Sequence, residues 1–251
     1  MTSSYEASDL LYPPWRSDRG WLMSHAERCA VLHVLQVGHP ISALEVGTAQ
    51  GGCLQHIRRH ARRTYSLDLL PEVRDRLAPE MPDVEFLIGD SKQMIPRALA
   101  ACEERGEPLG FALIDGDHTC AGVRGDLIAL LAYRPTCPLW VLMHDSTNPG
   151  CREGIATAPW SANPHVHMVD LDFVNGAMSE SPEFRGMLWG GLAIALLRPE
   201  PRQHELTVAA SAVTTYENLF RASRHNPTLI NWVRHWIEVK RRGLARRLGK
   251  K

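Results

Sequence analysis

The sequence predicts an α/β protein built on a doubly wound, mostly parallel β-sheet with helices on both faces. Two observations carry this prediction. Short apolar runs alternate with helix-compatible stretches from residue 43 to residue 143, and a glycine-rich turn follows the first of these runs. With 251 residues, of which 44% are hydrophobic, the chain is long enough to bury the core of one such domain.

A first helix is expected directly after Ser24, whose hydroxyl can cap it, and it ends near Gly38. Its apolar residues recur at spacings of three and four, as on the buried face of a helix: Ala26, Ala30, Val31, Val34 and Leu35. The segment before it, residues 1–20, is predicted to be an irregular lead-in. Within that segment, Pro13, Pro14 and Trp15 are candidates for a lid over a site.

Seven strands are predicted, and the first five alternate with helices. The strands are expected at residues 43–46, 64–67, 84–88, 111–114 and 139–143, with helices near 50–62, 71–78, 92–104 and 121–132. Parallel neighbours need a crossover connection, which is usually a helix, so the alternation indicates a parallel sheet covered on both faces. Two later apolar runs, 165–174 and 190–197, complete a seven-stranded sheet.

The chain after residue 200 is predicted to be a helical extension, residues 201–251, of a domain that spans residues 21–200. Residues 228–248 are expected to form a C-terminal amphipathic helix docked on the domain or on a second subunit, so we expect a homo-oligomer. Between Arg234 and Lys251 stand eight lysines or arginines and one acid. This basic tail is either a solvated helix end or a surface for an anionic partner.

The composition argues against several broad classes of protein. Lysine and arginine together number 28, as do the acids, so net charge does not indicate a nucleic-acid binder. Six cysteines without a C-x-x-C pair are typical of reduced thiols in the cytoplasm. The first residues lack the features of a signal peptide, and no run approaches the roughly 18 apolar residues that span a bilayer. We therefore expect a soluble, cytoplasmic protein with no nucleic-acid partner and no membrane span.

The glycine-rich turn runs from Glu45 to Gly51, directly after the first predicted strand. In a doubly wound sheet, ligands bind over the carboxyl ends of the strands, where this turn lies. Gly47 allows a sharp turn, and Gly51 and Gly52 allow a ligand to approach the backbone closely. The glycine spacing is not the G-x-G-x-x-G of dinucleotide-binding proteins, and the turn has no Walker lysine, so the spacing alone leaves the ligand open.

Acidic residues at the ends of the next strands indicate a nucleoside. Asp68 ends the second strand, 23 residues after Glu45, and an acid there can bind both hydroxyls of a ribose. Asp90 and Ser91 follow the third strand, within reach of an adenine. Each acid alone is as typical of a helix cap or a turn, but acids at three successive strand ends form one coherent rim.

Two motifs at the ends of the fourth and fifth strands suggest a reaction centre, at residues 114–118 and 143–146. Neighbouring parallel strands lie about 4.8 Å apart, so Asp115 and Asp145 can converge on one ion. Carboxylates are ligands for Mg²⁺ or a similar divalent metal, which would hold a substrate hydroxyl and lower its pKa. His118, with an ordinary pKa near 6.5, is suited to removing the hydroxyl proton.

With these residues in place, residues 43–146 resemble a class I S-adenosylmethionine-dependent methyltransferase, which has a Rossmann-like fold. Within that group the segment is similar to the bacterial macrolide-sugar and cephalosporin-type O-methyltransferases. The resemblance implies that Glu45 and Gly47 lie by the methionine moiety, that Asp68 holds the ribose, and that Asp90 and Ser91 flank the adenine. The same resemblance extends the cofactor site to further neighbours: Thr48, Gly51, Leu69 and Asp115.

The resemblance also implies that Asp115 is a metal ligand and His118 the general base, with an acid pair after the fifth strand completing the ligands. Here the sequence departs from the pattern, because His144 stands where the first acid is expected. Imidazole is a poor ligand for Mg²⁺ but suits Mn²⁺, Fe²⁺ or Zn²⁺. His144 is therefore a metal ligand beside Asp115 and Asp145, or a second catalytic base, or the enzyme works without metal. We expect a divalent ion, Mg²⁺ or Mn²⁺.

The predicted function is methylation of a hydroxyl on a small molecule, a sugar or a glycosylated natural product. The alternatives are a non-catalytic nucleotide-binding protein on the same fold and a nicotinamide-dependent oxidoreductase. Asp126 is predicted to be an exposed or helix-packing acid. The long connection 147–189 is expected to carry the substrate wall, with these candidates: Arg152, Trp160, Asp170, Asp172, Phe173 and Trp189.

Overall fold

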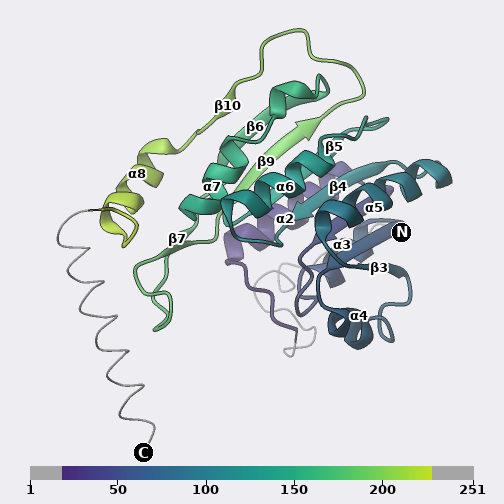
Figure 1. Cartoon of the computed structure of the whole chain (residues 1–251), viewed down its shortest axis with the longest axis horizontal. Helices are drawn as coiled ribbons and strands as arrows, with labels where there is room; N and C mark the ends of the chain where they lie inside the picture. Colours follow the sequence, from purple (N-terminus) through teal and green to yellow (C-terminus); the bar gives the residue numbers. More distant parts are fainter. Residues whose placement is uncertain (1–18, 228–251) are drawn as a thin grey trace, which may run out of the picture.

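A computed structural model describes residues 19–227 and arranges eight strands in one sheet, in the order β10-β6-β9-β5-β4-β1-β2-β3 (Figure 1). The strands are β1 (Ser42–Val46), β2 (Arg63–Asp68), β3 (Val84–Ile88), β4 (Leu109–Ile114), β5 (Leu139–His144), β6 (Val166–Val174), β9 (Leu192–Leu197) and β10 (Val208–Ala209). A separate two-stranded sheet joins β7 (Ala177–Met178) to β8 (Leu188–Trp189).

The strand order reverses between β1 and β4, which creates a switch point at the carboxyl ends of the strands. β1 to β5 are parallel, whereas β9 runs antiparallel between β5 and β6. Val46 of β1 pairs with Ile114 of β4, and Ile114 pairs with Met143 of β5. These three strands therefore end together, and the residues that follow them meet at one edge of the sheet.

Helices cover both faces of the sheet. One face carries α2 (His25–Gly38), α3 (Leu54–His60) and α4 (Pro71–Leu77). Buried residues of α2 and α3 pack against β4 and β5, and buried residues of α4 pack against α3 and β3. The other face carries α5 (Ser91–Arg105), α6 (Cys120–Leu130) and α7 (Pro149–Ala156). Figure 1 shows α5, α6 and α7 in front of the sheet and α2 behind it. A final helix, α8 (Val213–Ala222), follows β10.

Helix α2 begins as the sequence predicts. The Ser24 side chain accepts a hydrogen bond from the Glu27 amide, and the Glu27 side chain accepts one from the Ser24 amide, so the two residues form a capping box. At the other end, His39 adopts the left-handed conformation that ends the helix. The buried face contains Val31, Val34 and Leu35, which the spacing of apolar residues predicts.

The predicted α/β class, with a mostly parallel sheet covered on both faces, is confirmed. The main sheet has one strand more than the seven expected, because β10 is only two residues long and leaves no periodic signal. Helix α7 was not predicted, although Asn148 caps it and Pro149 occupies its first position. The predicted lid at Pro13–Trp15 and the helix at 228–248 lie outside the described residues. The division at residue 200 stays a prediction.

Two absences concern the described residues. Within 19–227, no helix combines the length and apolar character needed to cross a membrane. All six cysteines fall inside this range, and each is a free thiol there. Neither finding tests the expected cytoplasmic location.

Candidate active site

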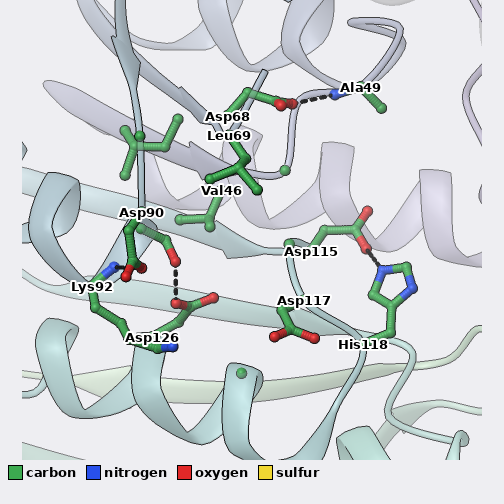
Figure 2. Close-up of a pocket in the computed structure, with 16 residues that line it drawn as sticks. Val46, Ala49, Asp68, Leu69, Asp90, Lys92, Asp115, Asp117, His118 and Asp126 are labelled. Carbon is green, nitrogen blue, oxygen red and sulfur yellow. Dashed lines mark hydrogen bonds and ion pairs between the residues drawn. The ribbon is translucent and has the colours of Figure 1, made fainter. Parts of the chain in front are cut away.

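A cavity of about 560 Å³ opens at the carboxyl ends of β1 to β4 (Figure 2). The strand ends meet here because of the parallel register described above. Most of the predicted cofactor residues line it: Gly47, Asp68, Leu69, Asp90, Ser91 and Asp115. In Figure 2 the carboxylates of Asp68, Asp90 and Asp115 come from three different strand ends around the same space.

Asp68 is held in a fixed orientation by two backbone amides. Ala49 donates to Oδ2 and Leu70 donates to Oδ1, each at 3.0 Å. The first contact ties the end of β2 to the glycine-rich turn after β1. A carboxylate oxygen accepts more than one hydrogen bond, so Asp68 keeps acceptor capacity for ligand hydroxyls.

The far wall of this cavity contains a buried acid whose role the sequence did not reveal. The Ser91 hydroxyl donates to Oδ1 of Asp126 at 2.5 Å, and Asp126 lines the cavity. Asp126 is 1% exposed, and burial raises the pKa of its carboxyl. Of the two positions predicted for Asp126, the exposed one is wrong and the helix-packing one agrees with the structure, since α6 turns this side chain toward Ser91 of α5. Asp90 caps α5 by accepting from the Lys92 amide.

A second cavity of about 450 Å³ adjoins the first and shares part of its wall. The residues that line both are Gly47, Ala49, Asp115 and His118. Glu45 lines the second cavity, and its Oε2 has no hydrogen-bond partner within the described chain. Burial raises the pKa of Glu45 to about 8. A buried carboxyl oxygen without a partner is costly, so this position favours a ligand that brings a cation or a donor.

Glycine at position 47 is required by the close approach of β1 and β4. Gly47 has φ +86°, and a Cβ there would lie 2.0 Å from the carbonyl oxygen of Asp115. The other predicted residues of this turn differ. Thr48 lines the second cavity and shares a 2.6 Å hydrogen bond with Ser66. Gly51 lines neither cavity, and its α-carbon faces Leu77 of α4.

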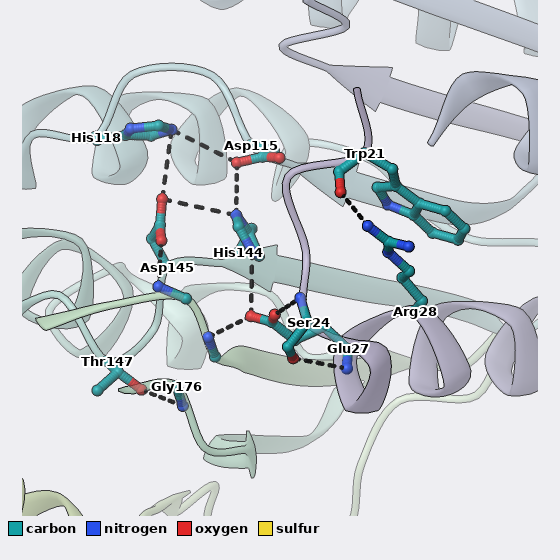
Figure 3. A network of polar contacts seen from close by, with 12 residues as sticks. Trp21, Ser24, Glu27, Arg28, Asp115, His118, His144, Asp145, Thr147 and Gly176 are labelled. Atoms are coloured by element: carbon teal, nitrogen blue, oxygen red, sulfur yellow. Dashed lines mark hydrogen bonds and ion pairs between the residues drawn. The ribbon is translucent and has the colours of Figure 1, made fainter. Parts of the chain in front are cut away.

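His144 is clamped between two carboxylates from opposite sides (Figure 3). Its Nδ1 lies 2.9 Å from Oδ1 of Asp115, and its Nε2 lies 3.2 Å from Oε1 of Glu27. Burial alone would lower the pKa of His144, but Asp115 and Glu27 outweigh it and hold this pKa well above its usual range. Both ring nitrogens of His144 therefore face a carboxylate oxygen.

His118 faces Asp115 and Asp145 and lines both cavities. Its Nε2 lies 3.5 Å from Oδ1 of Asp115 and 3.5 Å from Oδ2 of Asp145. The hydrogen bond to Asp115 raises the pKa of His118 above 6.5. The ring packs edge to face on Trp189, with centroids 5.7 Å apart. His118 thus lies between the acid cluster and an aromatic wall.

Asp145 adopts an uncommon backbone conformation, with φ +56°. Its Oδ1 accepts a 2.6 Å hydrogen bond from the Gly190 amide, and its Oδ2 lies 3.6 Å from Nδ1 of His144. Non-glycine residues in the left-handed region carry strain and cluster at functional sites. Here the conformation turns the carboxylate back toward His144 directly after β5.

The acid and imidazole groups suit a divalent ion. Asp115, His144 and Asp145 each offer one ligand atom, all within 4.8 Å of one another. Two ligands about 2.1 Å from an ion and at right angles are about 3.0 Å apart. Nδ1 of His144 lies 2.9 Å from Oδ1 of Asp115 and 3.6 Å from Oδ2 of Asp145. The donor set of two carboxylates and an imidazole suits Mn²⁺, Fe²⁺ or Zn²⁺ better than Mg²⁺. The residues present therefore fit the predicted metal.

The second cavity has an aromatic wall built by two segments far apart in the sequence. One is the segment before α2, with Trp21 and Met23, and the other is the β7–β8 hairpin, with Phe184 and Trp189. The Phe184 and Trp189 rings meet edge to face at 5.4 Å. Trp189, a substrate-wall candidate from the sequence, lines this second cavity. Trp21 and Phe184 were missed, because nothing local marks either residue as facing a site.

The other predicted wall residues build the far end of the sheet instead. Trp160 is buried and donates its indole N–H to the Ile155 carbonyl. Arg152 is buried and donates to Asp172 at 2.6 Å, so it is not free to meet a substrate anion. The remaining candidates lie apart from both cavities: Asp170, Asp172 and Phe173. The two cavities therefore give no support to a substrate-wall role for these residues, because residue type does not reveal which side chains line a cavity.

No protein-family model and no curated protein sequence matches the chain. Solved structures do match it. An O-methyltransferase from Bacillus cereus in complex with SAH is 14% identical, covers 70% of this chain and 82% of its own, and has a TM-score of 0.51. The chain has the fold of the S-adenosylmethionine-dependent methyltransferases. The resemblance stated for residues 43–146 is confirmed at that level, and the macrolide-sugar branch stays a prediction.

Other methyltransferase structures match with similar coverage. A candidate methyltransferase, yhhF, from Escherichia coli is 10% identical, covers 73% of this chain and 91% of its own, and has a TM-score of 0.50. The N-methyltransferase NodS from Bradyrhizobium japonicum in complex with S-adenosyl-L-homocysteine is 14% identical, covers 74% and 92%, and has a TM-score of 0.49. At such identities the likeness concerns the fold alone, and the acceptor must be argued from the site.

Proposed function

We propose that this protein transfers a methyl group from S-adenosylmethionine to a hydroxyl of a small molecule with a ring, such as a sugar or a glycosylated natural product. One observation carries the proposal. A nucleoside-sized cavity rimmed by strand-end acids meets a second, aromatic cavity at Asp115 and His118. A cofactor in the first cavity and an acceptor in the second would meet beside an imidazole.

The residues around the two cavities fit this cofactor. Asp68 is oriented to accept hydrogen bonds from the ribose hydroxyls, and Asp90 and Ser91 lie where an adenine would. The unpartnered Oε2 of Glu45 suits the amino group of the methionine moiety. When bound, the cofactor supplies a methyl group on a sulfonium centre, so the protein mainly has to position and deprotonate the acceptor.

His118 is the general base of the proposed reaction. Its Nε2 accepts the proton of the acceptor hydroxyl, and the nearby carboxylates of Asp115 and Asp145 stabilise the imidazolium that results. His144 is less suited to this role, because it is buried and both its nitrogens contact carboxylates. Trp189 and Phe184 would pack on the acceptor ring and keep water from the base.

Asp115, Asp145 and His144 would hold the divalent ion. Bound there, the ion would lower the pKa of the acceptor hydroxyl. The imidazole ligand favours Mn²⁺ over Mg²⁺. Exhaustive chelation should therefore abolish turnover, with activity restored by added Mn²⁺. Unchanged turnover after chelation would contradict the metal part of the proposal and leave the methyl-transfer part standing.

The alternatives explain less of the site. A nicotinamide-dependent oxidoreductase would lack the G-x-G-x-x-G turn, since Ala49 occupies the second glycine position. A non-catalytic nucleotide-binding protein would have no need for the cluster of two histidines and two aspartates, His118, His144, Asp115 and Asp145, where the cavities adjoin. The absence of a nucleic-acid partner, the homo-oligomer and the cytoplasmic location stay predictions.

Calorimetric titration with S-adenosylhomocysteine tests the cofactor. We expect saturable binding that Asp68→Ala weakens, because that change removes the oriented ribose acceptor. The surface change His33→Ala is the matched control and should bind as the unaltered protein does. No binding at millimolar ligand would overturn the proposal. With binding established, transfer of labelled methyl to a panel of cyclic alcohols identifies the acceptor.

A further inference from the structure

We infer that Glu27, in the first turn of α2, is a positioning residue of the proposed metal centre that holds His144 so that its Nδ1 faces Asp115 and Asp145. The inference rests on the divalent ion of the proposed function. The other residues of this site lie at the carboxyl ends of β4 and β5. The inference adds to them a residue from the N-terminal end of α2.

The contacts of Glu27 reach three separate elements (Figure 3). Its Oε1 lies 3.2 Å from Nε2 of His144, 117 residues away in the sequence, and accepts a hydrogen bond from the Gly191 amide. Its Oε2 accepts from the Ser24 amide within the capping box. Glu27 thereby joins the start of α2 to the end of β5 and to the turn before β9.

Capping alone does not account for this arrangement. A capping box uses the glutamate at the surface end of a helix and needs only its contact with the Ser24 amide. Glu27 is instead 2% exposed, and a buried carboxylate is costly unless it is paired. Both of its oxygens accept a hydrogen bond from a backbone amide, Oε2 from Ser24 and Oε1 from Gly191. The group therefore acts as an acceptor on both oxygens, and Oε1 also faces Nε2 of His144.

A carboxylate that accepts on both oxygens donates no hydrogen bond, so Nε2 of His144 carries the proton of the 3.2 Å contact. Nδ1 is then the nitrogen that faces Asp115 at 2.9 Å and Asp145 at 3.6 Å. Histidines that bind metals commonly donate their other ring N–H to a carboxylate, which fixes the ring orientation. The geometry of Glu27 and His144 is of this kind.

Two consecutive amides hold the arrangement together. Gly190 donates to Oδ1 of Asp145, and Gly191 donates to Oε1 of Glu27. Both glycines have positive φ, and a Cβ on Gly190 would lie 2.9 Å from Oε1 of Glu27. One turn therefore positions a candidate metal ligand and the residue that orients another ligand.

Metal affinity, measured on the full-length protein, tests the inference. Mn²⁺ is titrated, and the free ion is followed by its electron paramagnetic resonance signal. We expect Glu27→Gln to weaken Mn²⁺ binding by about 10- to 100-fold. Affinity for S-adenosylhomocysteine should stay unchanged, because Glu27 lines neither cavity. Ser24→Ala is the matched control: it breaks the capping box, lowers the melting temperature and leaves Mn²⁺ affinity unchanged.

A double-mutant cycle separates positioning from general stability. In a His144→Ala background, Glu27→Gln should cause little further loss of Mn²⁺ affinity, because the residue that it orients is gone. Should Glu27→Gln fail to bind S-adenosylhomocysteine and so prove unfolded, Glu27→Asp replaces it, since its shorter side chain withdraws from His144.

Three outcomes would overturn the inference. Equal Mn²⁺ affinity in Glu27→Gln and the unaltered protein would do so and leave the metal site standing. Equal weakening by Ser24→Ala would mean that helix stability, and not His144, is responsible. An unaltered protein that binds no Mn²⁺ would overturn both this inference and the metal site, while binding of S-adenosylhomocysteine would still support the cofactor.

Discussion

Among single residues, Glu45 occupies an environment that strongly disfavours its own charge. The side chain is 1% exposed, and burial raises its pKa from 4.5 to about 8. Between these values the folded chain holds a proton that the unfolded chain has released, so stability falls as pH rises across this window and is level above it. A residue that costs stability in the empty protein is typical of a binding site.

Glu45→Gln should therefore stabilise the protein without ligand and weaken the cofactor. We expect a melting temperature roughly 5 °C higher at pH 8, a difference that shrinks toward pH 5, because the amide carries no charge. Affinity for S-adenosylhomocysteine should fall about 10-fold as the amino-group partner is lost. Thermal melts across pH and calorimetry measure the two effects. The exposed Glu72→Gln is the control, and a pH-independent difference would contradict the account.

His118 is the residue on which proton transfer depends. His118→Gln should reduce turnover about 10²- to 10⁴-fold, the usual contribution of a general base. Affinity for S-adenosylhomocysteine should change little, because the backbone of the cavity is retained. Steady-state kinetics and calorimetry measure both quantities. A variant that keeps most of its turnover would show that another group accepts the proton.

Between elements, the approach of β1 to β4 leaves no room for a side chain at Gly47. Gly47→Ala should lose most of its cofactor affinity and destabilise the fold, because the new Cβ would lie 2.0 Å from the Asp115 carbonyl oxygen. Gly106 is the matched control, with φ +63° and nothing within 4 Å of a Cβ. Gly106→Ala should cost only about 1 kcal/mol of stability and no affinity. Equal effects of the two changes, in melts and calorimetry, would refute the steric argument.

The β7–β8 hairpin contributes the proposed acceptor wall. Trp189→Ala should lower kcat/KM for the acceptor at least 10-fold, because the ring surface that packs on the acceptor is lost. Affinity for S-adenosylhomocysteine should be retained, since Trp189 lines only the second cavity. Phe173→Ala removes a half-exposed aromatic ring that lies outside both cavities and serves as the control. Equal losses for the two variants would exclude the hairpin as an acceptor wall.

For the whole molecule, both cavities are lined by residues between Gly20 and Gly190. Deletion after Asn231 should therefore leave S-adenosylhomocysteine affinity within about twofold, while acceptor binding or assembly changes. Calorimetry and sedimentation velocity distinguish these effects. Loss of folding in the shortened chain would instead make the C-terminal segment part of the core.

For the molecule as a whole, the sequence determined the fold class and the positions of the acids at the strand ends. Strands, helices and caps follow from local periodicity and turn chemistry, so the sequence alone predicts Asp68, Asp90 and Asp115 at one edge of a sheet. The approach of Asp115 to His144 follows from the same parallel topology.

Only the tertiary structure decided which distant side chains complete the site. Glu27 meets His144 across 117 residues, Asp126 turns inward to Ser91, and Trp21 lines the same cavity as Trp189. Arg152, a plausible substrate contact by residue type, is instead paired with Asp172. Local sequence determines how a segment folds. Which buried polar groups find partners depends on the packing of elements that are far apart in the chain.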